Sequence, residues 1–581
     1  MIKINIVAFI VLQWIGLHAH ASGKQSHWQQ GDSTDKIAHR YISPTRILWK
    51  TGKIRNENQL LQEGNGQADL TNASMTILKN ERKHTSSILL DFGKELHGGL
   101  EIVTGMWNPG NVPRRIRVRF GESASEAMAE LGEKGATNDH AIRDMEILVP
   151  WLGKIQVGQT GFRFVRIDLL DANAELHLKE VRAIFAYRDI PYLGSFNSSD
   201  ERLNQIWQTG AYTVHLNMQE YLWDGIKRDR LVWVGDLHPE VATVNAVFGH
   251  NEVVPKSLDL ARDVTPLPGW MSGISTYSMW WIILHHDWYR HHGDLNYLRE
   301  QQPYLAGLVR QIAAKIDKKG KENMDGNRFL DWPSSEDPVA IHAGLQAMTQ
   351  WSLSIAVELT EILGDRQTKA IAVDALSRMK GYIPAPGSTK QAAALMAMTD
   401  MLPAVQADKE VLSVGGPANF STFYGYYMLQ AMAKAGNYKG AMDIIKTYWG
   451  AMLDLGATTF WEDFNINWIH NAGRIDELIP TGKIDVHADY GDYCYVGYRH
   501  SLCHGWASGP TAWLTEHVLG IKVIEPGSKS ILVKPNLGDL DFAEGSYPTP
   551  YGILYVKHTK GKDGKIKSII NAPKEVKIIR E

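Results

Sequence analysis

The stretch DGIKRDRLVWVGD, residues 224–236, concentrates charge, glycine and tryptophan in the middle of the chain. It holds three aspartates, three cations, two glycines and one tryptophan. A second dense cluster, GATTFWED at residues 456–463, lies far downstream. Carboxylates beside cations can transfer protons, and an indole ring offers an apolar wall. Such stretches also occur as solvated loops with surface ion pairs, so composition alone leaves a functional pocket and a plain loop open.

Helix-like segments surround the stretch 224–236. They span 200–218, 237–249, 275–292, 295–316, 342–363, 390–401, 422–435 and 438–451. Ser199-Asp200-Glu201 is a typical helix start, and the run TYSMWWIIL at 276–284 is apolar nearly all round, which predicts a buried helix. So many helices in one block favour either a ring of helix pairs or an irregular helical domain, and periodicity does not separate the two.

Both ends of the chain have the alternating pattern of β-strands. Before residue 190 the strand-like segments are 87–92, 100–103, 115–120 and 162–167, and after residue 521 they are 530–535, 552–558 and 576–579. We therefore expect an N-terminal β-sandwich over residues 22–192, a helical domain over 193–519 and a small C-terminal β-sandwich over 520–581.

The composition narrows the class of protein. A chain of 581 residues exceeds the usual size of one hydrophobic core, and its net charge of −3 argues against nucleic acid as a partner. There are 19 tryptophans, and sugar C–H faces pack on such rings, although tryptophan is also ordinary core. No CxxC or HExxH motif is present, so we expect no metal and no cofactor. Cys494 and Cys503 leave a disulfide open.

Residues 1–21 have the pattern of a secretory signal peptide. Lys3 precedes an apolar run from Ile6 to Ile15, and Ala19-His20-Ala21 offers small residues at the spacing of a cleavage site. The run is too short for a comfortable membrane span. We expect a periplasmic or secreted chain that is not inserted in a membrane after cleavage; an uncleaved anchor is the alternative.

The strand–helix–strand layout and the stretch 224–236 together resemble the family 78 glycoside hydrolases, the inverting α-L-rhamnosidases. That family carries a motif close to Asp-Cys-Pro-x-Arg-(Asp/Glu)…Gly-Trp-x-Gly-Asp. Matching positions are Asp224, Arg228, Asp229, Trp233, Gly235 and Asp236. Gly225-Ile226 stands where the family has Cys-Pro, and Asp229 stands at a position that is often Glu.

Three further segments follow the family's order. Thr458-Thr459-Phe460-Trp461-Glu462 fits a Thr-Thr-x-Trp-Glu motif, Cys503-His504 fits an Asn-His or Cys-His step, and Asp331-Trp332 looks like a sugar-binding Asp-Trp pair. The resemblance covers roughly residues 80 to 560. It implies a multidomain α and β fold in which a central (α/α)6 barrel is flanked by the N-terminal and C-terminal β-sandwiches.

The resemblance also implies a role for each matched residue. Asp229 would protonate the glycosidic oxygen, and Glu462 would activate water on the opposite face of the sugar ring. The expected substrate-binding residues are Asp224, Arg228, Trp233, Asp236, Asp331, Trp332, Trp461 and His504. Each has an ordinary structural alternative: Asp229 could pair with a neighbouring arginine, Asp236 could cap the helix that follows it, and His504 and the tryptophans could be core.

The function that we expect is removal of terminal α-L-rhamnose from a carbohydrate by inverting hydrolysis. One rival is an unsaturated uronyl hydrolase or a lyase on a similar barrel. A lyase needs a Tyr or His base and a cation, for which the candidates are Tyr490, Tyr493, Tyr495, Arg499 and His500. A second rival is a carbohydrate-binding homologue without catalysis, because Asp229 replaces the usual Glu. The exact glycan and the oligomeric state stay open.

Overall fold

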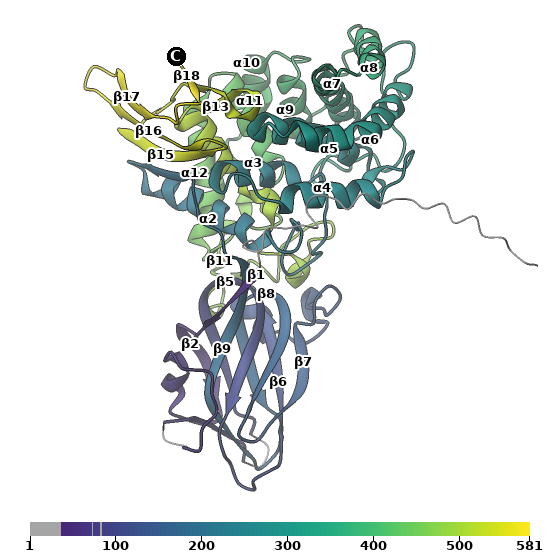
Figure 1. Cartoon of the computed structure of the whole chain (residues 1–581). Coiled ribbons are helices and arrows are strands. Elements are labelled where there is room, and N and C mark those ends of the chain that lie inside the picture. Colours follow the sequence, from purple (N-terminus) through teal and green to yellow (C-terminus); the bar gives the residue numbers. More distant parts are fainter. Residues whose placement is uncertain (1–36, 72–73, 82–83) are drawn as a thin grey trace, which may run out of the picture.

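The computed structural model describes residues 37–71, 74–81 and 84–581. The predicted signal peptide lies outside these residues. Figure 1 shows an elongated molecule, with a β-sheet domain at one end, a helical block at the other and a smaller group of C-terminal strands against the helices. Within the described ranges, no helix has both the length and the apolar character needed to cross a bilayer.

The N-terminal domain is one antiparallel network of nine described strands. Their order is β3-β4-β9-β5-β8-β6-β7, with β1 also paired to β9 and β2 to β5. The strands are β1 (Ile37–Ile42), β2 (Arg46–Thr51), β3 (Lys53–Arg55), β4 (Thr76–Lys79), β5 (Ser87–Thr104), β6 (Arg114–Gly121), β7 (Asp144–Val149), β8 (Lys154–Leu169) and β9 (Glu175–Arg188). The segments predicted as strands in this region lie within β5, β6 and β8.

Strand β5 pairs with two different strands along one of its edges. One edge of β5 follows β8, while the other edge pairs with β2 over Ser87–Asp91 and then with β9 over Gly98–Thr104. The change of partner falls next to Gly98, whose φ of 140° and 1.9 Å gap between a built Cβ and the Ile184 carbonyl oxygen leave no room for a side chain. Apolar residues such as Phe120 and Phe162 fill the interior.

The helical block contains the eight helices predicted from the sequence, and α4 and α8 in addition. Its longer helices are α2 (Glu201–Asn217), α3 (Leu237–Val247), α4 (Val253–Asp263), α5 (Ser275–His292), α6 (Leu295–Ala314), α7 (Pro338–Leu363), α8 (Arg366–Met379), α9 (Lys390–Met398), α11 (Gly425–Lys434) and α12 (Tyr438–Asp454). The short α10 (Ala404–Ala407) and α13 (Gly509–Trp513) complete it, while α1 (Ala124–Met128) belongs to the sheet domain. The helix start predicted at residues 199–201 is confirmed: Asp200 caps α2 by accepting from the amides of Arg202 and Leu203.

Aromatic rings from four helices fill the interior of the helical block. The His238 ring of α3 stacks on Trp280 of α5 at 4.7 Å, and Trp280 stacks on Tyr427 of α11 at 4.9 Å. Trp351 of α7 meets Trp280 edge-on at 5.4 Å. We call these four rings the aromatic plug. The predicted buried helix is therefore the inner helix α5, whose Trp280 and Trp281 are buried.

Two small sheets pack against the helices near the C-terminus. One contains β13 (Ile521–Glu525), β14 (Ser530–Val533) and β18 (Lys577–Arg580), and the other contains β10 (Ser195–Ser198), β15 (Phe542–Thr549), β16 (Gly552–Lys560) and β17 (Ile566–Asn571). Strand β10 precedes the helical block in sequence but pairs with β15. The C-terminal sheets therefore include four residues that the sequence-based boundary assigned to the helical domain.

Candidate active site

A cavity of about 240 Å³ opens where the starts of α3 and α5 meet the loops that follow α12. It lies beside the N-terminal sheet domain, because its lining residue Asp229 contacts His140 of that domain. Its lining comes from five separate parts of the chain. The residues are Asp224, Arg228, Asp229, Trp233, Asp236, Ser272, Ile274, Tyr277, Asn327, Phe329, Trp332, Glu462, Cys494, Tyr495, His504 and Trp506.

Asp224 stabilises the loop of residues 224–236 through hydrogen bonds. Its carboxylate accepts hydrogen bonds from the amides of Asp229, at 3.1 Å, and Leu231, at 2.9 Å, and its carbonyl accepts from the amide of Gly505 at 2.8 Å. Gly225 is needed beside it because a Cβ there would lie 2.5 Å from the Arg228 carbonyl oxygen. Burial raises the pKa of Asp224 to about 7, against the opposing charge of His504.

Arg228 connects the two predicted catalytic carboxylates. Its Nη2 lies 3.4 Å from Glu462 Oε1, and its Nε lies 3.8 Å from Asp229 Oδ1. The other oxygen of Glu462 accepts from the Ser501 amide at 3.0 Å. Arg228 is buried, yet its Nε and Nη1 have no hydrogen-bond partner in the described part of the chain. Because buried donors are normally satisfied, they are available to a polar ligand.

Asp229 is the carboxylate of this group that solvent reaches most easily, with 22% of its side chain exposed. Its Oδ1 lies 3.2 Å from Nε2 of His140, a residue of the sheet domain between α1 and β7. The Arg230 guanidinium donates to the His140 carbonyl at 2.5 Å and so fixes that loop. The histidine contact is closer than the one to Arg228, and no motif near His140 pointed to it.

Asp236 forms a hydrogen-bonded trio with a tyrosine and a histidine. The Tyr277 hydroxyl donates to Oδ1 at 2.9 Å, and His504 Nε2 lies 3.2 Å from Oδ2. Asp236 occupies the N-cap position of α3, but its side chain makes no capping hydrogen bond. The capping role considered for Asp236 is therefore wrong, because the carboxylate turns to the cavity instead.

The charge of the trio follows from its burial and its contacts. Burial raises the pKa of Asp236, against the hydrogen bonds from His504 and Tyr277. Burial lowers the pKa of His504, but the bond to Asp236 and the charge of Glu462 outweigh it and leave that pKa raised. Nδ1 of His504 has no hydrogen-bond partner among the described residues and lies 3.9 Å from Glu462 Oε1. This nitrogen is a second free polar group at the cavity.

The aromatic wall includes two of the three predicted tryptophans. Trp233 and Trp332 line the cavity, together with Tyr495 and Trp506. Trp461 does not line it: the ring is buried and meets Phe464 edge-on at 5.7 Å. The neighbouring Glu462 faces the cavity, so these two adjacent side chains point to different sides.

Asp331 also lies outside the lining of the cavity. Its carboxylate accepts from the Ser334 hydroxyl at 2.6 Å, the Ser421 hydroxyl at 2.9 Å and the Gln391 amide at 3.0 Å. With these donors it ties the loop before α7 to α9 and to the loop before α11. The structure thus gives Asp331 a role in holding Trp332, next to it, at the wall.

The sheet domain reaches behind the cavity through Glu122. Its Oε2 accepts from the Leu502 amide at 2.6 Å and lies 3.0 Å from the Lys227 ammonium. Glu122 Oε1 also accepts from the Ser501 hydroxyl at 3.4 Å. Because the Ser501 amide binds Glu462 and Lys227 precedes Arg228, one buried carboxylate supports both halves of the candidate site. Glu122 was not among the site residues predicted from the sequence.

Two described groups of side chains could hold a metal ion by their spacing. In each, three ligand atoms lie within 4.8 Å of one another; the groups are Asp224, Asp236 and His504, and Glu122, Glu126 and His487. In the second group the Lys227 ammonium already supplies the positive charge. In the first, the backbone amides, Tyr277 and His504 itself satisfy the carboxylates.

Comparison with known proteins bears on this geometry. Residues 191–380 match the family model described as the bacterial α-L-rhamnosidase six-hairpin glycosidase domain, and residues 520–579 match the bacterial α-L-rhamnosidase C-terminal domain. A protein named α-L-rhamnosidase from Alteromonas sp. (strain LOR) is 24% identical in an alignment of 548 residues that covers 84% of this chain and 55% of that protein. The chain spans about half the length of the curated relatives it matches.

Solved structures share the fold. A GH78 family rhamnosidase of Bacillus sp. GL1 aligns with a TM-score of 0.71 at 21% identity, over 88% of this chain and 55% of that one. A rhamnosidase from Klebsiella oxytoca with rhamnose bound aligns with a TM-score of 0.63 at 19% identity, over 83% of this chain and 96% of that one. The predicted resemblance is confirmed: two stretches of the chain match family models of bacterial α-L-rhamnosidase domains, and its fold is shared with solved rhamnosidase structures.

Proposed function

We propose that this chain is an exported glycosidase that removes terminal α-L-rhamnose from oligo- or polysaccharides by inverting hydrolysis, with its helices arranged as an (α/α)6 barrel. One observation carries the proposal. The cavity brings the carboxylates of residues 224–236 together with Glu462 and His504, which are more than 200 positions away in the sequence. These are the residue types that protonate a leaving group, activate water and bind sugar hydroxyls.

Inversion requires two carboxylates with room for a water molecule between them. A single guanidinium, that of Arg228, contacts both Asp229 and Glu462. The two carboxylates are therefore within about 10 Å of each other, compatible with the roughly 6.5–9.5 Å of inverting glycosidases. In this proposal Asp229 protonates the glycosidic oxygen, and Glu462, oriented by Ser501 and Arg228, accepts a proton from the attacking water.

Asp224 is the second candidate for the proton donor. Its pKa of about 7 means that a large fraction carries a proton at neutral pH, as a general acid needs. Its two backbone hydrogen bonds and its burial, however, restrict its approach to a leaving group. Asp229 is favoured because its carboxyl is the more exposed to a ligand in the cavity.

The remaining lining residues suit a deoxy sugar. The free donors of Arg228 and Nδ1 of His504 can bind ring hydroxyls, and Asp236 can accept from them. Trp233 and Trp332 offer apolar faces for ring C–H groups and for the C6 methyl of rhamnose.

The contacts favour hydrolysis over a lyase reaction. Among the candidates for a lyase base, Tyr495 lines the cavity, but burial raises its pKa well above the ordinary value. Burial also lowers the pKa of His500, whose Nε2 accepts from the Asp463 amide at 2.9 Å. Arg499 is outside the lining and pairs with Asp139. The product distinguishes the two reactions, because a lyase forms an absorbing C4–C5 double bond and a rhamnosidase releases free rhamnose.

The test is hydrolysis of a 4-nitrophenyl α-L-rhamnoside followed by proton NMR. We expect β-L-rhamnose as the first product, because inversion changes the anomeric configuration. On this substrate Glu462→Gln should lower kcat about 10²–10⁴-fold, and Asp229→Asn should cause a loss of that size on a rhamnoside with an alkyl leaving group. The matched controls Asp374→Asn and Glu361→Gln, on the exposed faces of α8 and α7, should keep full activity.

Leaving-group dependence identifies the acid. Loss of the proton donor costs little with a nitrophenyl leaving group and much with an alkyl alcohol, whereas loss of the base costs the same with both. We expect this split for Asp229→Asn and its absence for Glu462→Gln. If Asp224→Asn shows the split and Asp229→Asn does not, the acid is Asp224. If the wild type binds rhamnosides without turning them over, the enzymatic proposal fails.

A further inference from the structure

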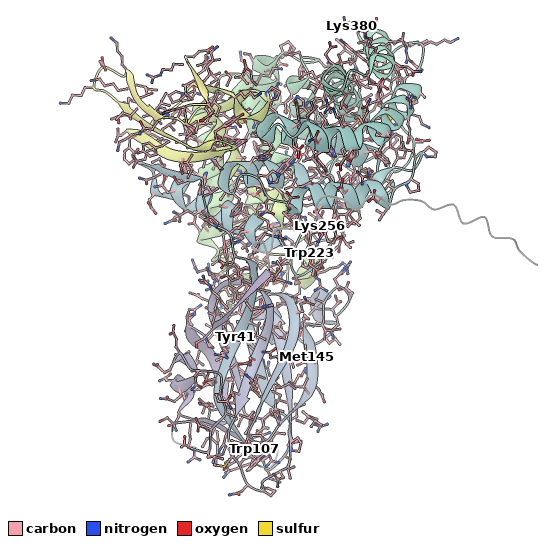
Figure 2. All side chains as sticks on the ribbon, viewed as in Figure 1. Tyr41, Trp107, Met145, Trp223, Lys256 and Lys380 are labelled. Atoms are coloured by element: carbon pink, nitrogen blue, oxygen red, sulfur yellow. The ribbon has the colours of Figure 1, made fainter. Side chains whose placement is uncertain are left out.

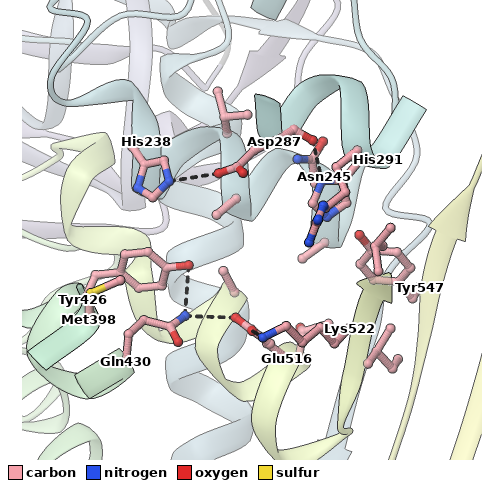
Figure 3. A pocket seen from close by; sticks show the side chains of 18 of the residues that line it. His238, Asn245, Asp287, His291, Met398, Tyr426, Gln430, Glu516, Lys522 and Tyr547 are labelled. Carbon is pink, nitrogen blue, oxygen red and sulfur yellow. Dashed lines mark hydrogen bonds and ion pairs between the residues drawn. The ribbon is translucent and has the colours of Figure 1, made fainter. Parts of the chain in front are cut away.

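The helical block contains a second cavity, larger than the candidate active site. Its volume is about 380 Å³, compared with 240 Å³ for the first. Figure 3 shows side chains that line it. It lies where the far ends of α3 and α5 meet α11, the segment 512–516 and the C-terminal strands β13 and β15. Its polar and aromatic lining residues are His238, Asn245, Asp287, Arg290, His291, Trp351, Tyr426, Gln430, Glu516, Lys522 and Tyr547.

The aromatic plug separates this cavity from the candidate active site. Asp236, at the start of α3, faces the first cavity, and Asn245, near the end of the same helix, lines the second. At 1.5 Å per residue the two positions are about 14 Å apart along the helix. His238 and Trp351 belong to the plug and also line the second cavity. The two cavities are therefore separate spaces.

Two carboxylates of the second cavity are held in place by neighbouring side chains. Asp287 lies 3.0 Å from Nε2 of His238 and 3.0 Å from Nδ1 of His286. Glu516 accepts from the Gln430 amide at 2.9 Å, and that amide also donates to the Tyr426 hydroxyl (Figure 3). Burial acts to raise the pKa of Asp287, but the two histidines outweigh it and hold that pKa well below its usual value. The ligand would thus meet a preorganised acceptor.

The cavity also presents donors. Asn245 is 3% exposed; its Oδ1 lies 2.8 Å from Nε2 of His292, and its Nδ2 has no partner within the described residues. An orphaned buried amide of this kind is uncommon and marks a place where a ligand oxygen can bind. Arg290 and Lys522 add positive charge, and Lys522, 56% exposed, lies on the side that solvent reaches.

We propose that this second cavity is a saccharide-binding site that takes one neutral pyranose unit. The lining offers both acceptors and donors, and Trp351, Tyr426 and Tyr547 offer ring faces for C–H groups. An anionic sugar would meet Asp287 and Glu516, and a cationic one would meet Arg290 and Lys522. Only a neutral polyol uses both sets of groups without a repelled charge.

The test counts binding events by calorimetric titration with L-rhamnose and D-glucose as probes, and with D-glucuronate and D-glucosamine as charged counterparts. We expect the wild type to bind a neutral probe at two sites. Ala242→Trp, which fills the second cavity, should remove one event, and Arg228→Ala should remove the other. Val405→Trp places the same ring on an exposed position of α10 and is the matched control. Each cavity variant keeps one binding event, which shows that it has folded.

A second variant measures the polar contact. Asn245→Ala should weaken the event that survives in Arg228→Ala by about tenfold, because one hydrogen bond is lost. Methyl glycosides of the same sugars should bind equally well if the site takes a unit of a longer glycan, and only the free sugars should bind if it takes a monosaccharide. The proposal is overturned if Ala242→Trp leaves the number of events unchanged, or if a charged probe binds as tightly as the neutral ones. Neither result depends on rhamnoside hydrolysis.

Discussion

Replacing Lys227 by methionine tests how the sheet domain supports the candidate active site. The Lys227 ammonium is buried and contacts four acceptors: Glu122 Oε2 at 3.0 Å, Glu126 Oε1 at 3.3 Å, and the carbonyls of Tyr498 and His500 at 2.9 and 2.7 Å. Burial acts to lower the pKa of Lys227, but the two glutamates outweigh it and leave that pKa raised, so the ammonium is charged. Methionine fills a similar volume and removes the charge and every donor.

The expected cost follows from the groups left behind. Removing one partner of a buried ion pair costs about 3–5 kcal/mol, because the remaining charge is buried without compensation. Glu122 makes this cost depend on pH. Burial raises the pKa of Glu122 to about 7 even with Lys227 beside it, and without Lys227 this pKa rises further. A carboxyl with a raised pKa loses stability as pH rises, so the loss should be largest near pH 8.5 and about 1–3 kcal/mol near pH 5.

Thermal unfolding followed by circular dichroism at pH 5, 7 and 8.5 measures this effect. For a domain the size of the N-terminal sheet, 1 kcal/mol corresponds to roughly 2–4 °C, so the midpoint should fall by about 10 °C at pH 8.5. Lys227→Met combined with Glu122→Gln should recover part of the midpoint and flatten its pH dependence, because the amide carries no charge. Lys439→Met, which breaks only exposed pairs with Asp443 and Asp539, is the control and should leave the midpoint unchanged.

The result that refutes this reasoning is a Lys227→Met variant whose midpoint falls equally at all three pH values. That outcome would mean that the lysine acts through volume and not through its charge. Activity gives a second readout, because a displaced Ser501–Leu502 segment releases Glu462. We expect kcat to fall with little change in KM.

The other predictions concern single residues. The pKa of Asp224 is raised from 3.8 to about 7, so the wild type loses stability as pH rises through about 4–7. The free energy of unfolding of Asp224→Asn should therefore rise by up to about 4 kcal/mol relative to that of the wild type between pH 4 and 8. A difference between the two free energies that stays constant with pH would contradict this. Trp332→Phe should raise KM, whereas Trp461→Phe should lower the free energy of unfolding by about 1–3 kcal/mol and leave KM unchanged. Burial raises the pKa of Cys494 to about 11, and it also raises the pKa of Cys503. A thiol reagent at pH 8 should therefore label both free cysteines rapidly only after denaturation. If only one thiol is labelled in the denatured protein, the other has been modified.

Local patterns predicted the elements well because their causes are local. Asp200 caps α2 with its own side chain. The apolar run at 276–284 forms a helix that is buried, as its composition alone indicates. Strand β10 was missed for the opposite reason: Ser195–Ser198 is short and becomes a strand only because β15, far along the chain, pairs with it. Periodicity carries no information about such a partner.

The candidate site was predicted where a motif carried the information. The spacing in residues 224–236 places Asp224, Arg228, Asp229 and Asp236 at one cavity, and Glu462 comes with its own motif. Trp461 and Asp331 show the limit, because a motif names neighbouring residues but does not say which side chain faces inward. Both are buried behind the residue beside them, with partners of their own.

The contacts across the domain boundary explain why the site could not be derived from the helical segments alone. The region that matches the six-hairpin glycosidase domain, residues 191–380, includes Asp229 but neither His140 nor Glu462. His140 reaches Asp229 from the sheet domain, and Glu122 of the same domain holds the segment that binds Glu462. Both carboxylates proposed for catalysis are thus oriented from outside the helices. A rotation of the sheet domain would move the two supports together, so the packing of this domain is itself part of the geometry proposed for catalysis.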